Sequence, residues 1–454
     1  MEHFYLTVGD AVCGKIKKVN GVNLAPPINT EGSCASIRKD FEELHVPLVR
    51  MHDAPLDNPG LNLVDVNLIF PFNHLDPSDY RNYNFRATDD YLRKCIEGGS
   101  GIYYRLGCSI DHSINKYNID PVTDVEKWVQ IVSGIIDHYN YGWGNGFEFD
   151  IKYWEIWNEP EGTCHDLHTM WNAPFETFMP FFVDACIALK KRYPQLKFGG
   201  PSFVNWIRPE CKQLLQYCAE RNFAPDFFSF HGYGHFTGKH VWAVTEARNY
   251  LDSLGMKDTE IHFNEWRFTP PGLFDSINGD RSTLAEKYEY MRNSAQAATQ
   301  AVSVMIRFQD APCDQAYYYT ASGGNFGIFD SSSKKKQKCY YALKAFGDLA
   351  FFCPDRLPCT IAGKMAEETF EGFGIVNVLA ARGPEFDTVL VSSYQMDEPS
   401  KLHLSVGKNR YSYAEIKVID GEHNLETVTE YNELPESVEI DIPAGSSVFM
   451  IVLR

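Results

Sequence analysis

Two short segments of this chain contain an Asn-Glu pair. The first is IKYWEIWNEPEG at residues 151–162, and the second is IHFNEW at residues 261–266. Each begins with the apolar and aromatic residues typical of a β-strand and then reaches a glutamate, Glu159 or Glu265. Paired carboxylates on either side of a bond are what glycoside hydrolysis requires, because one protonates the departing oxygen while the other attacks or stabilises the sugar.

The residues around the first glutamate should restrict its direction. Pro160 fixes its own φ and favours extended geometry at the preceding residue. We therefore expect Glu159 to be aimed from a strand end, with Asn158 beside it as both donor and acceptor. A solvated acidic turn is the alternative for a single Glu-Pro pair, and the second Asn-Glu segment argues against that alternative.

The separation of the two glutamates predicts the fold that positions them. They are roughly 106 residues apart, which is about three strand-plus-helix units of roughly 30 residues or more. Three such units place both glutamates on the rim of a (β/α)8 barrel, where these folds build their active sites. The eight predicted strands lie at residues 21–24, 46–51, 102–107, 151–157, 196–200, 227–230, 261–266 and 316–320.

The pattern of apolar and polar residues changes near residue 345. Beyond it, short alternating runs are separated by Gly, Pro, Asn and Asp, which is typical of an all-β sandwich. The sequence thus predicts an α/β fold, a (β/α)8 TIM barrel over residues 15–344 followed by a C-terminal β-sandwich over residues 345–454. Within the barrel, one long helix is expected from about residue 283 to 307.

Four motifs together resemble glycoside hydrolase family 39, within the clan of retaining (β/α)8 glycosidases. They are WNEP at 157–160, HGY at 231–233, NEW at 264–266 and GGNFGI at 323–328, and the resemblance covers most of residues 20–345. It implies β-xylosidase-like or α-L-iduronidase-like activity, with Glu265 as nucleophile and Glu159 as acid and base. It also implies that residues 1–14 add a strand to the sandwich, and the mechanism requires no metal and no cofactor.

The resemblance also suggests residues that bind the sugar or support the nucleophile. The family has an Arg-x-His pattern at the end of its second strand, which corresponds here to Arg50 and His52. An internal ion pair of Arg50 with Asp53 is the alternative, because buried charges are usually paired. At the end of the sixth strand, the clan places a residue that hydrogen-bonds the nucleophile, and we assign this role to Tyr233 and secondarily to His231.

The other predicted substrate contacts surround the two glutamates. Asn158 should orient the 2-hydroxyl of the sugar, and Trp266 directly follows the nucleophile. Tyr319 ends the last strand, and Phe326 in the following loop could stack against an apolar sugar face. For the tyrosines of this strand, packing inside the barrel is an equal alternative.

The nature of the substrate follows from charge. Family members that act on α-L-iduronides hold the uronate with a cation, commonly a lysine two residues after the strand-six histidine, and Tyr233 stands at that position. Together with a net charge of -18, this favours a neutral, β-xyloside-like glycoside. An endo-acting glycosidase, a transglycosylase and an inactive sugar-binding barrel are alternatives, although the intact glutamates argue against the last. The loop-rich residues 54–86 form either a pocket wall or packing on the outside of the barrel.

Composition excludes other classes of partner. A chain of 454 residues that is 44% apolar can bury a large core, and its acidic charge disfavours nucleic acid. No apolar run approaches the ~18 residues of a membrane span, and the start lacks a basic and apolar signal region. We therefore expect either a cytoplasmic protein or one whose signal has been removed. A carbohydrate is the expected partner, and a homo-oligomer is compatible with the sequence.

Cysteines and histidines give no metal pattern. The twelve cysteines contain no CxxC pair, so buried free thiols are expected, with Cys353 and Cys359 close enough in sequence for a disulfide. His165 and His168 have no third ligand at suitable spacing and are expected to be surface residues.

Overall fold

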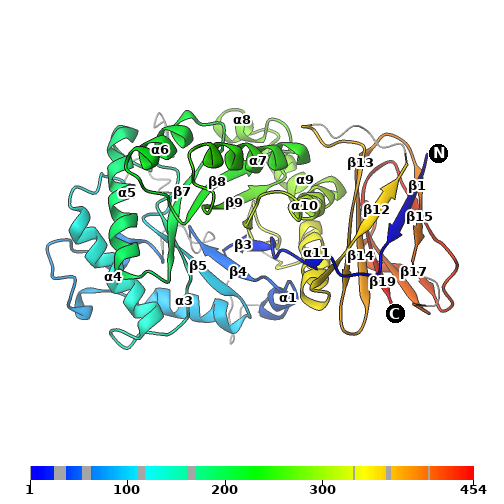
Figure 1. The fold of residues 1–454 in the computed structure, drawn as a ribbon, viewed down its shortest axis with the longest axis horizontal. Helices are drawn as coiled ribbons and strands as arrows, with labels where there is room; N and C mark the ends of the chain where they lie inside the picture. The colour runs from blue at the N-terminus through cyan, green and yellow to red at the C-terminus, as the bar shows by residue number, and fades with distance from the viewer. Residues whose placement is uncertain are drawn as a thin grey trace.

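Eight parallel strands close into a barrel in the order β10-β3-β4-β5-β6-β7-β8-β9, as seen in the computed structural model (Figure 1). The structure describes residues 2–24, 37–53, 63–110, 118–161, 170–330, 333–363, 370–406 and 410–454. The strands are β3 (Gly21–Asn23), β4 (Leu48–Met51), β5 (Gly101–Leu106), β6 (Tyr153–Ile156), β7 (Lys197–Phe203), β8 (Phe227–Tyr233), β9 (Glu260–Arg267) and β10 (Gln315–Tyr319). The prediction of a TIM barrel is confirmed, and each strand overlaps its predicted segment.

A helix follows each strand and covers the outside of the barrel. These helices are α1 (Arg38–Glu42), α3 (Arg86–Glu97), α4 (Val125–Tyr141), α5 (Phe175–Arg192), α6 (Pro209–Glu220), α7 (Thr237–Ser253), α10 (Ala295–Arg307) and α11 (Lys338–Phe352). Short helices in the connections are α2 (Val66–Ile69), η1 (Tyr80–Asn82), α8 (Leu273–Asn278) and α9 (Leu284–Asn293).

The long helix predicted near residues 283–307 is in fact two helices, α9 and α10. Ser294 separates them, because its backbone is extended at φ -82° and ψ 148°. Its side chain accepts a hydrogen bond from the Ala297 N–H at 3.1 Å and so caps α10. Serine is a favoured residue at a helix N-cap. The spacing of the apolar residues alone does not show that a new helix begins there.

Two antiparallel sheets form the other end of the molecule (Figure 1). One has the order β12-β1-β15-β18, with β1 (Glu2–Val8), β12 (Cys359–Ala362), β15 (Ser400–Ser405) and β18 (Val438–Ile442). The other has the order β17-β16-β19-β14-β13-β11-β2, with β2 (Gly14–Lys15), β11 (Asp355–Leu357), β13 (Ile375–Arg382), β14 (Asp387–Met396), β16 (Ala414–Ile419), β17 (Asn424–Tyr431) and β19 (Gly445–Leu453). Residues of both sheets, such as Leu402 and Ile451, share one apolar core, which confirms the C-terminal β domain.

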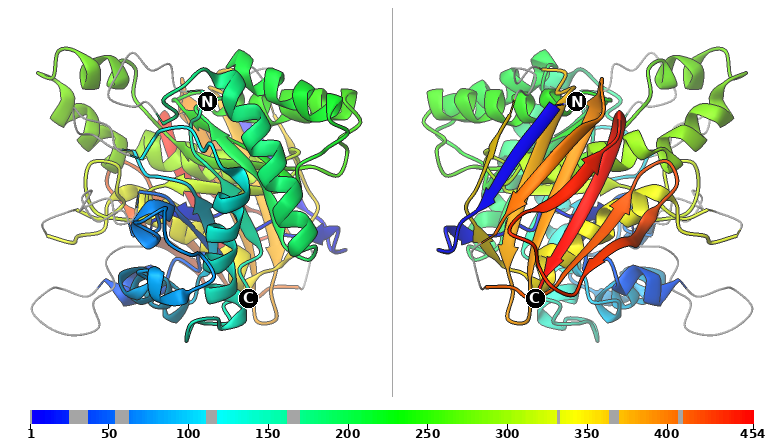
Figure 2. Two further views of the ribbon diagram at one scale, coloured as in Figure 1. Left: turned by 90° about the vertical axis from the view of Figure 1, so that its left-hand side faces the viewer. Right: turned by 90° about the vertical axis from the view of Figure 1, so that its right-hand side faces the viewer.

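The first strand of the chain lies within this β domain. β1 runs parallel to β15 and antiparallel to β12, and it is the blue strand in the right-hand view of Figure 2. The predicted boundary at residue 345 falls inside the continuous helix α11, and the sheets resume only at Asp355. Leu390 and Met450 of the larger sheet belong to the same core as the barrel helices, so the two parts are packed together.

The barrel interior is arranged in layers. A lower layer of aromatic rings comes from β5, β6, β8 and β10 and contains Tyr103, Tyr153, Phe227 and Tyr317. Inward-facing residues repeat every second position along a strand, so the next layer towards the C-terminal rim is set by the same register. That next layer is polar and charged, and it carries the candidate site.

Candidate active site

Arg50 lies at the centre of the polar layer and is completely buried. Its Nε donates to Glu155 Oε2 and its Nη1 donates to Glu265 Oε1, each at 2.7 Å. Burial opposes the charge of Arg50, but the Glu155 and Glu265 carboxylates outweigh it and raise the pKa of the guanidinium. The alternative in which Arg50 pairs with Asp53 is therefore wrong, because the two glutamates occupy the guanidinium.

Glu155 is a third carboxylate that the sequence analysis did not select. It lies on β6, two residues beyond Tyr153 on the inward face, and is completely buried. Besides Arg50, Glu155 Oε1 accepts hydrogen bonds from Ser229 Oγ at 2.7 Å and from Asn264 Nδ2 at 2.6 Å. A charged residue in the inward register of a barrel strand is the signal that could have identified it, because such a charge needs a buried partner.

A β-bulge on β9 allows consecutive residues to face the barrel axis. Phe263 pairs with Phe230, but the next pair joins Glu265 to His231, so Asn264 is an extra residue on β9. Asn264 Nδ2 can then reach the interior Glu155 while Glu265 points to the mouth.

The same bulge turns Trp266 away from the site. Trp266 is completely buried, and its ring packs edge-on against Tyr318 at 5.2 Å and near Phe308 at 6.4 Å. It lies in the layer between strands and helices, with no surface left to contact a sugar. The prediction that Trp266 binds substrate is corrected.

The carboxylate of Glu265 has protein contacts on both oxygens. Oε1 accepts from Arg50, and Oε2 accepts from the Tyr233 hydroxyl at 2.7 Å. Burial raises the pKa of Glu265, and its neighbour Glu159 adds to this, whereas the charge of Arg50 and the Tyr233 hydroxyl favour the ionised form. Tyr233 thus lies where the sequence analysis expected a donor to the nucleophile.

Glu159 leaves its strand in a conformation different from the expected one. Its φ is 47°, in the left-handed region rather than the extended region that Pro160 favours. The Glu159 N–H donates to the Ser202 carbonyl at 3.0 Å, which links the turn to the neighbouring strand β7 and outweighs the local preference. The Glu159 side chain is 16% exposed, so it reaches the mouth.

Several other residues around this mouth have strained backbone conformations. Asp53, Trp157 and Ser202 also have positive φ values, of 52°, 74° and 64°. Such conformations cost roughly 1–3 kcal/mol each in non-glycine residues and tend to occur where side chains must be held for function.

His231 lies between the two catalytic candidates. Its Nδ1 is 2.9 Å from Glu159 Oε1 and 3.5 Å from Glu265 Oε2. Burial lowers the pKa of His231 to about 4, so the imidazole is neutral at pH 7. Its Nε2 is 2.6 Å from the hydroxyl of Ser202, a residue that the sequence analysis missed.

Ser202 can determine which nitrogen of His231 carries the proton. Its hydroxyl accepts hydrogen bonds from Arg50 Nη2 at 2.8 Å and from Asn264 Nδ2 at 2.7 Å. The single hydroxyl proton can go to His231 Nε2, which leaves the proton of the neutral ring on Nδ1, facing the glutamates, or to Asn158 Oδ1 at 2.9 Å, in which case His231 Nε2 carries the ring proton. No local sequence pattern marks this serine, because its partners lie on β4, β8 and β9 and in the segment after β6.

Asn158 presents a free amide donor. Its Oδ1 accepts from Arg50 Nη2 at 2.8 Å and from Ser202 Oγ at 2.9 Å. These donors fix the orientation of the amide. Its buried Nδ2 has no hydrogen-bond partner among the residues that the structure describes, so it is available to a ligand hydroxyl.

Aromatic side chains form the rim above Glu265. Tyr319 stands edge-on to Tyr233 at 6.2 Å and to Phe326 at 5.8 Å. Phe274 of α8, which is 45% exposed, packs edge-on against Tyr233 at 5.8 Å. The predicted residues Tyr319 and Phe326 are thus brought to the mouth, whereas Tyr317, on the same face of β10, packs inside the barrel.

His52 is held on the side of the mouth formed by β4. Its Nδ1 accepts from Arg105 Nε at 3.2 Å, so Nε2 carries the proton. That Nε2 is 3.8 Å from Glu265 Oε1 and 3.3 Å from Asp53 Oδ2. Burial, together with Arg50 and Arg105, lowers the pKa of His52 well below its usual value, so it acts as a neutral donor.

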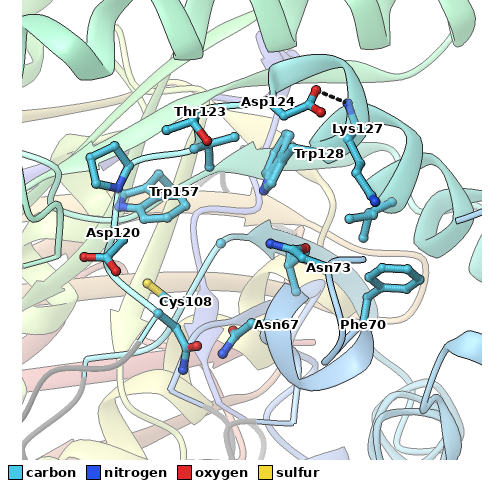
Figure 3. Close-up of a pocket in the computed structure, with 16 residues that line it drawn as sticks. Asn67, Phe70, Asn73, Cys108, Asp120, Thr123, Asp124, Lys127, Trp128 and Trp157 are labelled. Carbon is cyan, nitrogen blue, oxygen red and sulfur yellow. Dashed lines mark hydrogen bonds between the residues drawn. The ribbon is translucent and has the colours of Figure 1, made fainter. Parts of the chain in front are cut away.

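A separate cavity of about 430 Å³ lies outside the barrel mouth (Figure 3). Trp157 and Trp128 of α4 line it, as do Asn67 and Phe70 from the loop-rich segment, but neither Glu159 nor Glu265 does. Within described residues 63–86, Tyr83 and Phe85 pack on α4, whereas Asp65 accepts a hydrogen bond at 2.7 Å from Arg105, which holds His52. The segment thus contacts both the outer helix layer and the side of the mouth formed by β4. Residues 54–62 lie outside the described residues.

The described residues contain no group of three or more His, Cys, Asp or Glu side chains arranged to hold a metal ion. His165 and His168 fall outside them. Cys353 and Cys359 are both free thiols, so the disulfide considered for them is absent. Within the described part of the chain, no helix is both long and apolar enough to span a membrane.

The fold and the site define a (β/α)8-barrel protein whose mouth carries two glutamates from the ends of β6 and β9. The chain belongs to glycoside hydrolase family 39, since the profile described as "Glycosyl hydrolases family 39" matches residues 24–387.

Two curated relatives support this membership over part of the chain. A β-xylosidase of Geobacillus stearothermophilus is 29% identical over 164 residues, 33% of this chain and 31% of the relative. A β-xylosidase of Caldicellulosiruptor saccharolyticus is 30% identical over 122 residues, 26% of this chain and 23% of the relative. The matched segments thus span at most about a third of these relatives.

Solved structures share the fold over the whole chain. A glucosidase from Croceicoccus marinus superposes with a TM-score of 0.77 at 21% identity, covering 100% of this chain and 99% of its own. An α-L-arabinofuranosidase from Thermotoga petrophila superposes with a TM-score of 0.68 at 11% identity, covering 100% of both chains.

Proposed function

We propose that this protein is a retaining glycoside hydrolase that acts on a neutral, β-xyloside-like glycoside. The observation that carries the proposal is the shared contact of Glu159 and Glu265 with His231 Nδ1. Because the contacts are 2.9 and 3.5 Å, the contacting oxygens can be no more than roughly 6.4 Å apart, which supports the short carboxyl separation of a retaining site.

In the proposed reaction, a Glu265 oxygen attacks the anomeric carbon and forms a glycosyl-enzyme bond. The bond to the leaving oxygen breaks at the same time, and Glu159 donates its proton to that oxygen. Water then attacks the same carbon, Glu159 takes up the water proton, and the bond to Glu265 breaks. Arg50 and Tyr233 support the ionised nucleophile through their hydrogen bonds to it.

Asn158 supplies the proposed contact to the sugar 2-hydroxyl. Arg50 contacts its oxygen and Ser202 lies 2.9 Å from it, so the buried Nδ2, which has no partner among the described residues, is the donor left for the sugar. A hydrogen bond at the 2-hydroxyl strengthens as the oxocarbenium-like transition state develops, which makes it worth more than a ground-state contact.

The preference for a neutral sugar rests on the charges at the mouth. Tyr233 stands where family members that bind uronates commonly have a lysine, and Asp53 and Glu161 add buried carboxyl groups nearby. Burial and the adjacent Glu159 raise the pKa of Glu161 well above its usual value. A raised pKa favours the uncharged form of Glu161, so the negative charge that a sugar carboxylate would meet there comes from Asp53, and Tyr233 supplies no cation to balance it.

The test is hydrolysis of a panel of 4-nitrophenyl glycosides by the wild type and by Glu265→Ala, with and without azide. The panel contains the β-xyloside, the β-glucoside and the α-L-arabinofuranoside, since the matched proteins carry these names. We expect turnover of the β-xyloside, its loss in Glu265→Ala, and recovery with azide as a glycosyl azide of inverted configuration. A wild type inert on every monoglycoside would contradict the proposal and favour an endo-acting enzyme or a sugar-binding barrel.

A further inference from the structure

Asp53 is a buried carboxylate at the mouth that the proposed reaction does not use. It follows directly on β4 and His52, has a left-handed φ of 52°, and is only 7% exposed. Its Oδ1 accepts the Ile110 N–H at 3.0 Å, which ties it to the segment after β5. The backbone strain and the anchored oxygen hold the second oxygen, Oδ2, in a fixed position.

Asp53 Oδ2 faces the same side of the mouth as the nucleophile. It lies 3.3 Å from His52 Nε2 and 3.4 Å from the Tyr319 hydroxyl. His52 Nε2 is also 3.8 Å from Glu265 Oε1, so one imidazole N–H stands between the two carboxylates. Both contacts of Oδ2 are long for hydrogen bonds, and a carboxylate oxygen has two lone pairs, so Oδ2 can accept from a ligand hydroxyl.

The barrel order indicates which part of a sugar Asp53 would meet. In the closed ring of eight strands, β10 with Tyr319 lies opposite β6, which leads to Glu159. The leaving group must lie on the side of Glu159, because that residue protonates it. The end of the sugar distant from the anomeric carbon therefore points towards Tyr319 and Asp53.

We propose that Asp53 Oδ2 accepts a hydrogen bond from the C3 or C4 hydroxyl of the sugar that is being transferred. Asp53 thereby selects an uncharged sugar ring with a free hydroxyl at that position. This inference rests on the proposed glycosidase function and adds a specificity-determining residue to it. Burial raises the pKa of Asp53 to about 6, so the carboxylate is the predominant form above that pH.

The substitution Asp53→Asn isolates this contact. The amide oxygen of asparagine can keep the bond from Ile110, and its NH2 then replaces Oδ2 as a donor, so a hydroxyl loses its acceptor. The experiment compares kcat/KM of the wild type and Asp53→Asn on 4-nitrophenyl β-D-xylopyranoside and on its 3-deoxy and 4-deoxy analogues. We expect roughly a 100-fold loss on the parent xyloside, the range for a hydrogen bond to a charged group.

The deoxy analogues distinguish a sugar contact from a structural effect. On the analogue that lacks the contacted hydroxyl, kcat/KM of the wild type should already be roughly 100-fold lower than on the parent xyloside. Asp53→Asn should lower kcat/KM on that analogue little further, because the deoxy sugar has already removed the same hydrogen bond. The matched control is Asp226→Asn. The Asp226 carboxylate also accepts a backbone N–H, from Phe198 at 2.9 Å, but this residue precedes β8 and lies at the opposite end of the barrel.

Three outcomes would overturn the inference. An equal loss in Asp53→Asn on the parent and on both deoxy analogues would assign Asp53 a structural role. A wild type that loses no activity on either analogue would overturn it even if the variant failed to fold. A wild type inert on all three compounds would overturn the proposed function, and this inference with it.

Discussion

Arg50 and Glu265 form a buried ion pair, with Nη1 and Oε1 2.7 Å apart, between the second and the seventh strand of the barrel. The same guanidinium pairs with Glu155 through Nε at 2.7 Å. One buried cation therefore contacts two buried carboxylates, and the nucleophile candidate is held by a group that also organises the barrel interior.

The first prediction concerns Arg50→Lys. Lysine keeps the charge but cannot form the forked bonds to both glutamates, so one carboxylate loses its partner. We expect kcat/KM to fall roughly 100-fold or more and the free energy of unfolding to fall by about 3–5 kcal/mol, the cost of breaking a buried pair. Kinetics with the 4-nitrophenyl xyloside and urea unfolding measure the two effects.

Its matched control is Arg356→Lys. Arg356 pairs with Asp310, whose side chain is 74% exposed, and that pair lies outside the mouth. Exposed ion pairs contribute roughly 0–1 kcal/mol, so this variant should retain both activity and stability. Full activity of Arg50→Lys would contradict the role given to the buried pair.

A second prediction distinguishes the role of Glu159 from that of Glu265. The Glu159→Ala variant should keep most of the wild-type kcat/KM on a 2,4-dinitrophenyl glycoside, because that leaving group needs no protonation. A glycoside with a poor leaving group should lose roughly 10²–10⁴-fold, the usual contribution of a general acid. Equal losses on both substrates would show that Glu159 does not protonate the leaving group.

A third prediction follows from the position of Trp266. Because its ring packs against Tyr318 and Phe308 and is completely buried, Trp266→Ala should lower the free energy of unfolding by about 3–5 kcal/mol. KM for the xyloside should remain unchanged at a temperature where the variant is folded. Removal of Phe274, the exposed ring at the mouth, should have the opposite effect, raising KM with little change in stability. A raised KM in Trp266→Ala would restore it as a sugar contact.

The fourth prediction concerns acid stability. Burial lowers the pKa of His240 to about 3 from an ordinary value of 6.5. Between these values the unfolded chain binds more protons than the folded protein, so stability rises with pH across this window and is lost as pH falls below about 6.5. From pH 7 to pH 5 this group should cost about 2 kcal/mol of stability.

Replacement by phenylalanine tests this assignment. In His240→Phe, the difference in unfolding free energy between pH 7 and pH 5 should be smaller than in the wild type by about 2 kcal/mol. The control is His74→Phe, whose imidazole is exposed in the folded protein, and which should leave the pH dependence as in the wild type. An unchanged pH difference in His240→Phe would show that another group governs the acid limb.

The local sequence pattern was sufficient to predict the barrel strands and the two central residues of the site, Glu159 and Glu265. The barrel strands are short runs of apolar and aromatic residues between turn residues, and their order along the chain fixes a parallel barrel. Glu159 and Glu265 could be selected because each ends such a run next to an asparagine. The resemblance to the family added Tyr233 and His52, which the structure brings to the same mouth.

The site residues that were missed have partners far away in the chain. Glu155 depends on Arg50, 105 residues earlier, and Ser202 on Asn264, 62 residues later. Asp53 was considered only as a partner for its near neighbour Arg50. None of these side chains has a local signature, since a single buried serine or carboxylate resembles any other until its surroundings are known.

Which residues end the barrel strands can be predicted from the amino-acid sequence, because strand periodicity and turn residues are local properties of the chain. The directions in which those residues point depend on the folded barrel. The bulge that aims Asn264 and Glu265 inward and turns Trp266 outward is set by hydrogen-bond register with β8. The left-handed turn at Glu159 is supported by a bond to Ser202 on the next strand. Register and barrel closure depend on contacts between distant segments, which no local pattern specifies.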